Sequence, residues 1–198
     1  MKNITLIIFL ISSLFGKAQI ENLRQRYFSL KSLSGEFIET LKFAEGVDTQ
    51  IVFEGRFVFQ SPGNFRLDVT KPIPQLIISR DSTLLFYFPK EKRLVYQSST
   101  YPFPFLTFLQ PLFDTTARII EEENGKELII LIENQEGSFF TNMRLRLDKT
   151  KTKIEAFSFV DNCGNRYQFI LKNQQWNKTI PPKTFEFTPP SGTSIEYQ

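Results

Sequence analysis

Side chains that could act as nucleophiles or metal ligands are scarce in this sequence. It contains no histidine and a single cysteine, Cys163, so the common Ser–His and Cys–His arrangements and the commonest zinc ligand are missing. The G-x-S-x-G, G-x-x-x-x-G-K-[ST] and G-x-G-x-x-G motifs are also absent from the sequence. Cys163 falls in a predicted turn, and we assign no role to it. These residue types predict a protein that is not an enzyme and uses neither a metal nor a cofactor.

A carboxylate cluster, Glu121–Glu123, is the remaining candidate for acid–base chemistry. It stands directly before Asn124–Gly125, and Asn-Gly between two strand-like segments is a hairpin signal. A run of charges beside such a turn is usually a solvated edge. An enzyme that acts on lipid with a carboxylate pair is kept as an alternative, and its test is turnover of acyl esters that is lost when the three glutamates are changed.

Phenylalanine is unusually abundant, with 22 copies in 198 residues. Within 51–60, the odd positions from 53 carry Phe or Gly, while positions 54, 56 and 60 are polar, so one face of this predicted strand is aromatic. The pattern continues after a turn at 61–64. The residues expected to line an apolar ligand site are Phe53, Phe57, Phe59, Phe65, Leu67 and Phe86.

Two segments are available to cover this aromatic face. Residues 20–33 have the apolar spacing of an amphipathic helix. Residues 101–113 are apolar but carry three prolines, which exclude a central strand and leave a helical turn or two within 105–110. We expect this second segment to be a short lid that presents Phe105, Leu106 and Phe108.

Apart from these two segments, the pattern is that of strands. From Phe37 onward the segments alternate or are rich in aromatic and β-branched residues, down to a short predicted strand at 185–187. We expect a mainly β fold of about ten or eleven strands in an antiparallel meander, which forms either a barrel or a strongly curved open sheet. A core alone could explain the aromatic content. With so little helix to cover it, however, the face predicts a ligand cavity or a docking surface for a partner protein.

The first 18 residues have the features of a signal peptide: a basic start, a short apolar run and small residues before Gln19. The apolar run has twelve residues, 4–15, and is broken only by Thr5, Ser12 and Ser13. It would rise only about 18 Å as a helix, too little to span a membrane. Removing 1–18 leaves 22 basic and 21 acidic side chains in a single domain, 19–198. Without a basic stripe we expect no nucleic-acid partner. The expected product is an exported, soluble monomer in a bacterial periplasm.

Two groups of residues resemble the periplasmic lipoprotein carrier family, LolA. Residues 185–195, FEFTPPSGTSI, resemble the family's closing F-x-F-x-P-P-x-G-x-x-[VI]. Earlier in the chain, Gly55 to Pro89 resembles its succession of a G-x-hydrophobic run, P-x-x-F, I-[IV]-S and L-W-x-Y-x-P, without gaps. Phe65 matches the phenylalanine of P-x-x-F. The resemblance covers essentially the whole of 19–198.

This resemblance implies an unclosed antiparallel half-barrel, with the amino-terminal helix and the short helical lid over its concave apolar face. It also implies a carrier that takes the acyl chains of lipoproteins from an ATP-driven inner-membrane complex to an outer-membrane receptor. Three positions depart from the family pattern. Ser61 replaces an arginine that the family links with lid closure and release, Leu85 replaces its tryptophan, and Arg80–Asp81 replaces its Asp-Gly. The arginine's absence makes a related carrier of another acylated molecule, such as a pigment or a glycolipid, the main alternative.

Overall fold

The computed structural model describes residues 21–44, 49–80, 82–98, 118–124, 127–133, 140–148, 150 and 152–198, with side chains from Met143 onward and before residue 99. The predicted signal peptide, 1–18, and the predicted lid residues Phe105, Leu106 and Phe108 lie outside the described residues. No helix in the described ranges is long and apolar enough to cross a membrane.

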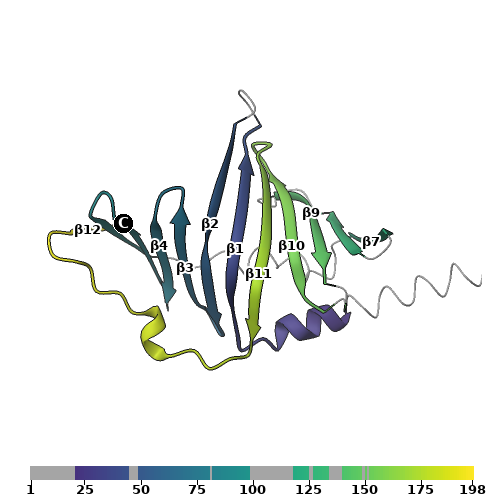
Figure 1. Ribbon diagram of the computed structural model, residues 1–198, viewed down its shortest axis with the longest axis horizontal. Helices are drawn as coiled ribbons and strands as arrows, with labels where there is room; N and C mark the ends of the chain where they lie inside the picture. The colour runs from purple at the N-terminus through teal and green to yellow at the C-terminus, as the bar shows by residue number, and fades with distance from the viewer. Residues whose placement is uncertain are drawn as a thin grey trace, which may run out of the picture.

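The described residues form one 12-stranded sheet and a short amino-terminal helix, residues 21–28 (Figure 1). The strands are β1 Ser32–Lys42, β2 Gln50–Gln60, β3 Asn64–Lys71, β4 Gln75–Arg80, β5 Thr83–Phe88, β6 Arg93–Ser98, β7 Arg118–Asn124, β8 Glu127–Glu133, β9 Phe140–Leu147, β10 Ile154–Asp161, β11 Arg166–Trp176 and β12 Ser194–Tyr197. The prediction of a mainly β protein is confirmed, with one or two more strands than the sequence indicated.

The sheet is two antiparallel meanders joined in the middle. Its strand order is β12-β6-β5-β4-β3-β2-β1-β11-β10-β9-β8-β7, so the first strand pairs with the eleventh and the outermost strands are β12 and β7. All neighbours are antiparallel except β12, which runs parallel to β6. The sheet does not close into a barrel, so of the two forms expected from the short connections the open sheet is present, as the family resemblance implies. Asn124 pairs with Glu127, which confirms the hairpin expected at Asn124–Gly125.

Two sequence predictions about element boundaries are wrong. The helix ends at residue 28 rather than 33, because Leu33 already pairs with Phe59 on β2 and with Trp176 on β11. No strand forms at 185–187: Phe185 is the last residue of a 3-10 helix, η1 Pro182–Phe185, and the last strand starts only at Ser194. Alternating aromatic residues indicated a strand there, but these side chains pack on the sheet from outside it.

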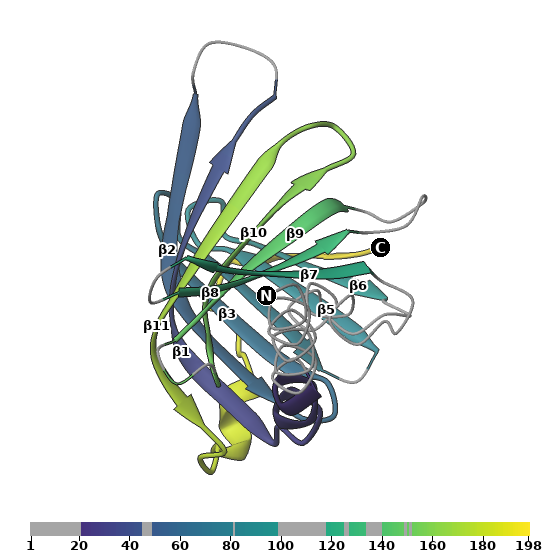
Figure 2. The ribbon, with the colours of Figure 1, turned by 90° about the vertical axis from the view of Figure 1, so that its right-hand side faces the viewer.

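The two faces of the sheet carry separate hydrophobic clusters. The inner face carries Phe37, Phe57 and Phe65 and is covered by the helix, whose Leu23 and Tyr27 belong to the same cluster. Figure 2 shows the helix lying within the curve of the sheet. The outer face carries the second cluster, which the carboxyl-terminal segment covers; its buried members are Leu76, Ile78, Leu85, Tyr87, Leu94 and Phe185.

Candidate functional site

Strands β2 and β3 bring five of the predicted site residues onto the inner face. Phe57 pairs with Leu67 and Phe59 with Phe65, and directly opposed residues of an antiparallel pair share a face. Phe53 joins them by strand alternation. Phe86, the sixth, reaches the same face from β5, where it pairs with Ile77 and Val95. The predicted grouping is therefore present, although contact of these residues with a ligand stays a prediction.

The structure divides these residues into a covered and a less covered half. Phe57, Phe59 and Phe65 are only 1%, 4% and 3% exposed and pack in one cluster with the helix. Phe53 and Leu67 are partly buried and lie at the margin of that cluster. The part of the inner face open to a ligand therefore begins at these two side chains, away from the helix.

The helix is held on the covered half by Tyr27. The Ile154 N–H donates to the Tyr27 hydroxyl oxygen at 3.0 Å, and the Tyr27 ring meets Trp176 edge-to-face with centroids 5.0 Å apart. Arg26 lies over the Trp176 ring at 4.6 Å. Burial raises the pKa of Tyr27, so its hydroxyl stays neutral at all physiological pH values. Amino-terminal residues of the chain are thus fixed to β10 and β11.

On the inner face, aromatic rings of β11 stack on buried rings of β10. Phe157 stacks on Phe169 with centroids 4.6 Å apart, and Phe159 stacks on Tyr167 at 4.8 Å. Tyr167 and Phe169 are partly buried and pack against the inner cluster. Together with Phe53, they form an apolar surface on both sides of β1. Such a surface favours binding of apolar groups by burial.

Glu39 is a functional candidate that the sequence prediction missed. It pairs with Phe53 on one side and Phe169 on the other, so its carboxyl group lies on the inner face among these rings. Burial raises the pKa of Glu39 to about 7 from 4.5. The signal was in the alternation of β1, where Leu33, Gly35, Phe37, Glu39 and Leu41 share a face. Glu39 is the one ionisable residue in that series, and this is the signal in the sequence that could have identified it.

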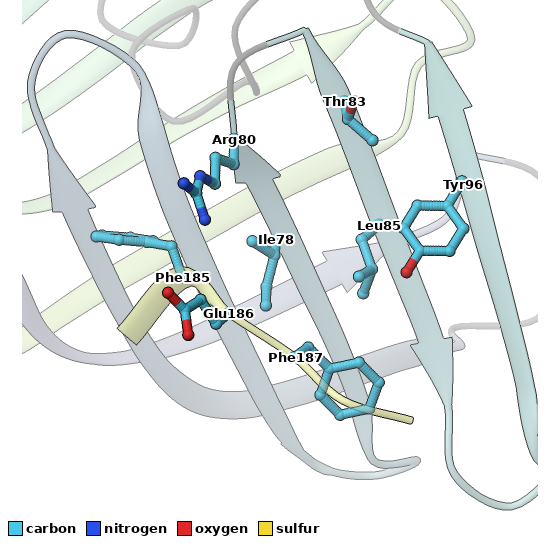
Figure 3. A pocket seen from close by; sticks show the side chains of 8 residues that line it. All are labelled: Ile78, Arg80, Thr83, Leu85, Tyr96, Phe185, Glu186 and Phe187. Atoms are coloured by element: carbon cyan, nitrogen blue, oxygen red, sulfur yellow. The ribbon is translucent and has the colours of Figure 1, made fainter. Parts of the chain in front are cut away.

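The outer face has a small pocket, apart from the predicted site (Figure 3). It holds about 320 Å³ between β4–β6 and the carboxyl-terminal segment. Its lining is Ile78, Arg80, Thr83, Leu85, Tyr96, Phe185, Glu186 and Phe187. This volume is near the lower limit for small-molecule sites, which run from roughly 300 to 1,000 Å³. The pocket contains none of the residues predicted to bind lipid.

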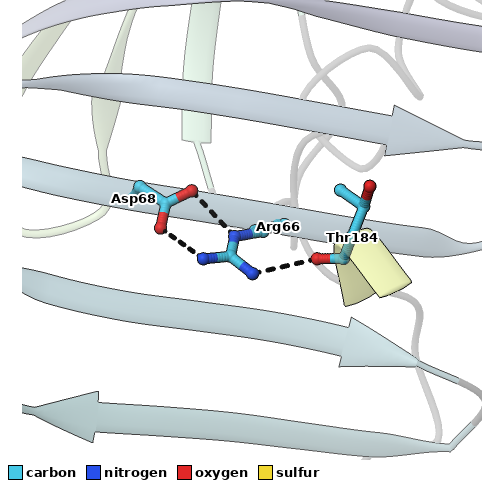
Figure 4. Close-up of polar contacts among 3 residues, drawn as sticks. All are labelled: Arg66, Asp68 and Thr184. Atoms are coloured by element: carbon cyan, nitrogen blue, oxygen red, sulfur yellow. Dashed lines mark hydrogen bonds and ion pairs between the residues drawn. The ribbon is translucent and has the colours of Figure 1, made fainter. Parts of the chain in front are cut away.

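Arg66 ties the carboxyl-terminal segment to the outer face (Figure 4). Its guanidinium donates to both carboxylate oxygens of Asp68, at 2.8 and 2.9 Å, and to the Thr184 carbonyl oxygen at 3.0 Å. The hydrogen bond with Asp68 is the main reason that the pKa of Arg66 is raised. Phe187 packs on Tyr87 nearby, with centroids 4.7 Å apart. This segment therefore covers the outer face, whereas the described residues cover the inner face only in part.

Other reactive groups in the described ranges do not assemble a catalytic site. Cys163 is exposed in the β10–β11 turn, where its backbone N–H donates to Asp161. Glu121–Glu123 belong to β7, at one end of the sheet order. Among the described residues, no group of three or more His, Cys, Asp or Glu side chains could hold a metal ion. The described geometry offers a surface for non-covalent binding.

Comparisons with known sequences identify one family, and a solved structure shares the fold. Residues 29–188 match the family model described as outer membrane lipoprotein carrier protein LolA. The chain is 30% identical to an outer-membrane lipoprotein carrier protein of Methylococcus capsulatus over 147 residues, covering 71% of this chain and 70% of the relative. It is 24% identical to the protein of that name from Serratia proteamaculans, covering 90% and 87%. An uncharacterized conserved protein from Thermus thermophilus has a similar fold, with a TM-score of 0.59, 11% identity and coverage of 92% and 99%.

Proposed function

The chain belongs to the family of outer membrane lipoprotein carrier proteins, LolA, and on this basis we propose that it shields the acyl chains of lipoproteins and transfers them from the inner to the outer membrane. The observation that carries the proposal is the aromatic inner face, which continues beyond the helix from Phe53 to Phe169. The proposed carrier acts by binding and release and not as an enzyme.

The free energy of burial explains why a carrier is needed. Each buried methylene contributes about 0.8 kcal/mol, so an acyl chain of around fifteen methylenes is destabilised in water by roughly 12 kcal/mol. On the carrier, the chain would extend the existing aromatic surface at Phe53, Leu67 and Phe169, which are only partly buried without it. Binding there requires no displacement of Phe57 or Phe65 from the core.

Release requires that the bound chain be weakly held in a second state of the protein. A carrier that binds all its contacts at full strength in every state would not deliver its cargo. Movement of the amino-terminal helix would alter the inner face directly, because Leu23 and Tyr27 share a cluster with Phe57. The lid expected from Phe105, Leu106 and Phe108 stays a prediction, since it lies outside the described residues.

The cellular setting follows from the same proposal. Residues 1–18 would direct export and be removed, and 19–198 would act as a single monomeric domain in the periplasm. An ATP-driven inner-membrane complex would load the carrier and an outer-membrane receptor would unload it. Depletion of the protein should leave lipoproteins in the inner membrane, and correct sorting without it would refute this role.

A matched pair of variants on β2 tests the site itself. Phe53→Glu places a charge on the inner face and should abolish binding of a triacylated lipopeptide. Val52→Glu is the control, because Val52 is the preceding residue, points to the other face and is already 38% exposed. Binding is measured by titration calorimetry with folding checked by circular dichroism. Equal binding by both variants would place the acyl site elsewhere.

Carriage of another acylated molecule is the second candidate, favoured by Ser61. This residue is exposed in the β2–β3 turn, and its N–H donates to the Lys31 carbonyl oxygen at 2.9 Å, close to the end of the helix. The serine therefore stands beside the proposed moving element, where the family's arginine would be. Mass spectrometry of material that co-purifies with the protein separates the candidates: a triacylated peptide supports the first, and a pigment or glycolipid the second.

A further inference from the structure

Glu39 places a carboxyl group in the less covered half of the inner face. It lies in the second half of β1, with Phe53 of β2 and Phe169 of β11 directly opposite it. Phe37 and Leu41 precede and follow it on the same face. Nearly all the surroundings of this acid are thus apolar, and they are the side chains to which the acyl site is assigned above.

The protein does not supply a partner for this carboxyl group in the described ranges. No hydrogen bond or ion pair to the Glu39 side chain is present among those residues, and the neighbouring strand β2 presents no charged side chain on this face next to it. From β11, Tyr167 approaches Glu39 closely enough to interact electrostatically. The Tyr167 hydroxyl, however, donates to Asp161 at 3.1 Å, so its proton is already engaged.

A partly buried acid without a partner is destabilising, because desolvation is not compensated by a hydrogen bond or an opposite charge. Replacement by leucine would continue the apolar series of β1, yet the chain keeps a glutamate among phenylalanines. Perturbed acids of this kind gather at binding and catalytic sites. A ligand that brings a hydrogen-bond donor would relieve the penalty, whereas an anionic ligand would increase it.

We propose that Glu39 accepts a hydrogen bond from a donor at the head of the acylated ligand, such as an amide N–H or an ammonium group, and so selects against anionic heads. This inference rests on the proposed acyl site and adds polar specificity to it. Apolar contacts with Phe53 and Phe169 would bind the acyl chain of the ligand, and Glu39 would fix the position of its polar head.

Four ten-carbon probes test this selection: N-methyldecanamide, decylammonium, methyl decanoate and decanoate, each kept below its aggregation concentration. At pH 8 Glu39 is mostly ionised, since its pKa is about 7. By titration calorimetry, the native protein should bind the amide about tenfold more tightly than the ester, the usual effect of a hydrogen bond to a charged group. Decanoate should bind most weakly.

Variants at two positions of β1 show whether the preference for the amide depends on Glu39. Glu39→Leu should bind the ester at least as well as the native protein and lose the preference for the amide. The isosteric variant Glu39→Gln should keep part of the amide preference and lose that for ammonium. Glu36→Gln is the matched control, because Glu36 lies on the opposite face and accepts a hydrogen bond from Asn173 at 2.8 Å; it should behave like the native protein.

The outcomes separate this inference from the proposed function. Equal binding of amide, ammonium and ester by the native protein, or a preference for either donor that persists in Glu39→Leu, would overturn the role of Glu39 and leave the acyl site intact. Failure of all four probes to bind would overturn both. A preference for ammonium without one for the amide would identify a cationic head as the ligand and support the role of Glu39 as its acceptor.

Discussion

Replacing Glu39 with glutamine should stabilise the protein at high pH and have little effect at low pH. Glutamine keeps the shape of the side chain and cannot ionise. Burial raises the pKa of Glu39 to about 7 in the folded protein, whereas 4.5 is its ordinary value. Between these two pH values the folded protein retains a proton that the unfolded chain has released. Its free energy of unfolding therefore falls as the pH rises through that window.

The magnitude follows from the size of the pKa shift. One pKa unit corresponds to about 1.4 kcal/mol, so the difference between 4.5 and about 7 sets an upper limit of about 3 kcal/mol at pH 8. Glu39 is only partly buried, and water around it should reduce the effect to about 1–2 kcal/mol. Tyr167, which faces it, has a pKa raised by burial, by Asp161 and by Glu39 itself. It therefore stays neutral throughout the window.

Urea unfolding of residues 19–198, followed by tryptophan fluorescence between pH 4.5 and 8.5, measures this effect. The stability difference between Glu39→Gln and the native protein should be near zero at pH 4.5 and favour the variant increasingly up to pH 8. A difference that is independent of pH, or that favours the native protein at pH 8, would refute burial of an unpaired carboxyl group at Glu39.

Three further substitutions test the packing described above. Phe57→Ala removes a ring that is 1% exposed and should reduce the free energy of unfolding by about 3–5 kcal/mol in urea titrations, unless the helix closes the cavity. Tyr27→Phe leaves the buried Ile154 N–H without its acceptor and should lower stability by about 1–2 kcal/mol, measured in the same way. Arg66→Ala removes the hydrogen bond to the Thr184 carbonyl, so amide exchange should accelerate in 182–187 while the sheet stays protected. Unchanged exchange there would show that the aromatic contacts alone hold that segment.

Local patterns in the sequence were sufficient for the mainly β fold class and for the face of the predicted site residues on β2, β3 and β5. Alternation along β2 and β3 placed Phe53, Phe57 and Phe65 together, because a strand has a period of two and hairpin pairing preserves the face. Residues 185–195 indicated the family correctly, but the secondary structure predicted for this segment was wrong. Alternating Phe185 and Phe187 matched a strand, yet they pack on an existing sheet from outside it.

The depth of each side chain depended on contacts between residues far apart in the chain. Pairing of β1 with β11 and the position of the helix decided that Phe57 is buried while Phe53 remains partly accessible. Pairing of β1 with β2 and β11 places Phe53 and Phe169 on either side of Glu39, and this burial raises the pKa of Glu39. Sequence alone determined which residues share a face, since that depends on neighbours along one strand. Only the tertiary structure decided which part of that face is open and which acid it desolvates, because burial depends on every element packed around a residue.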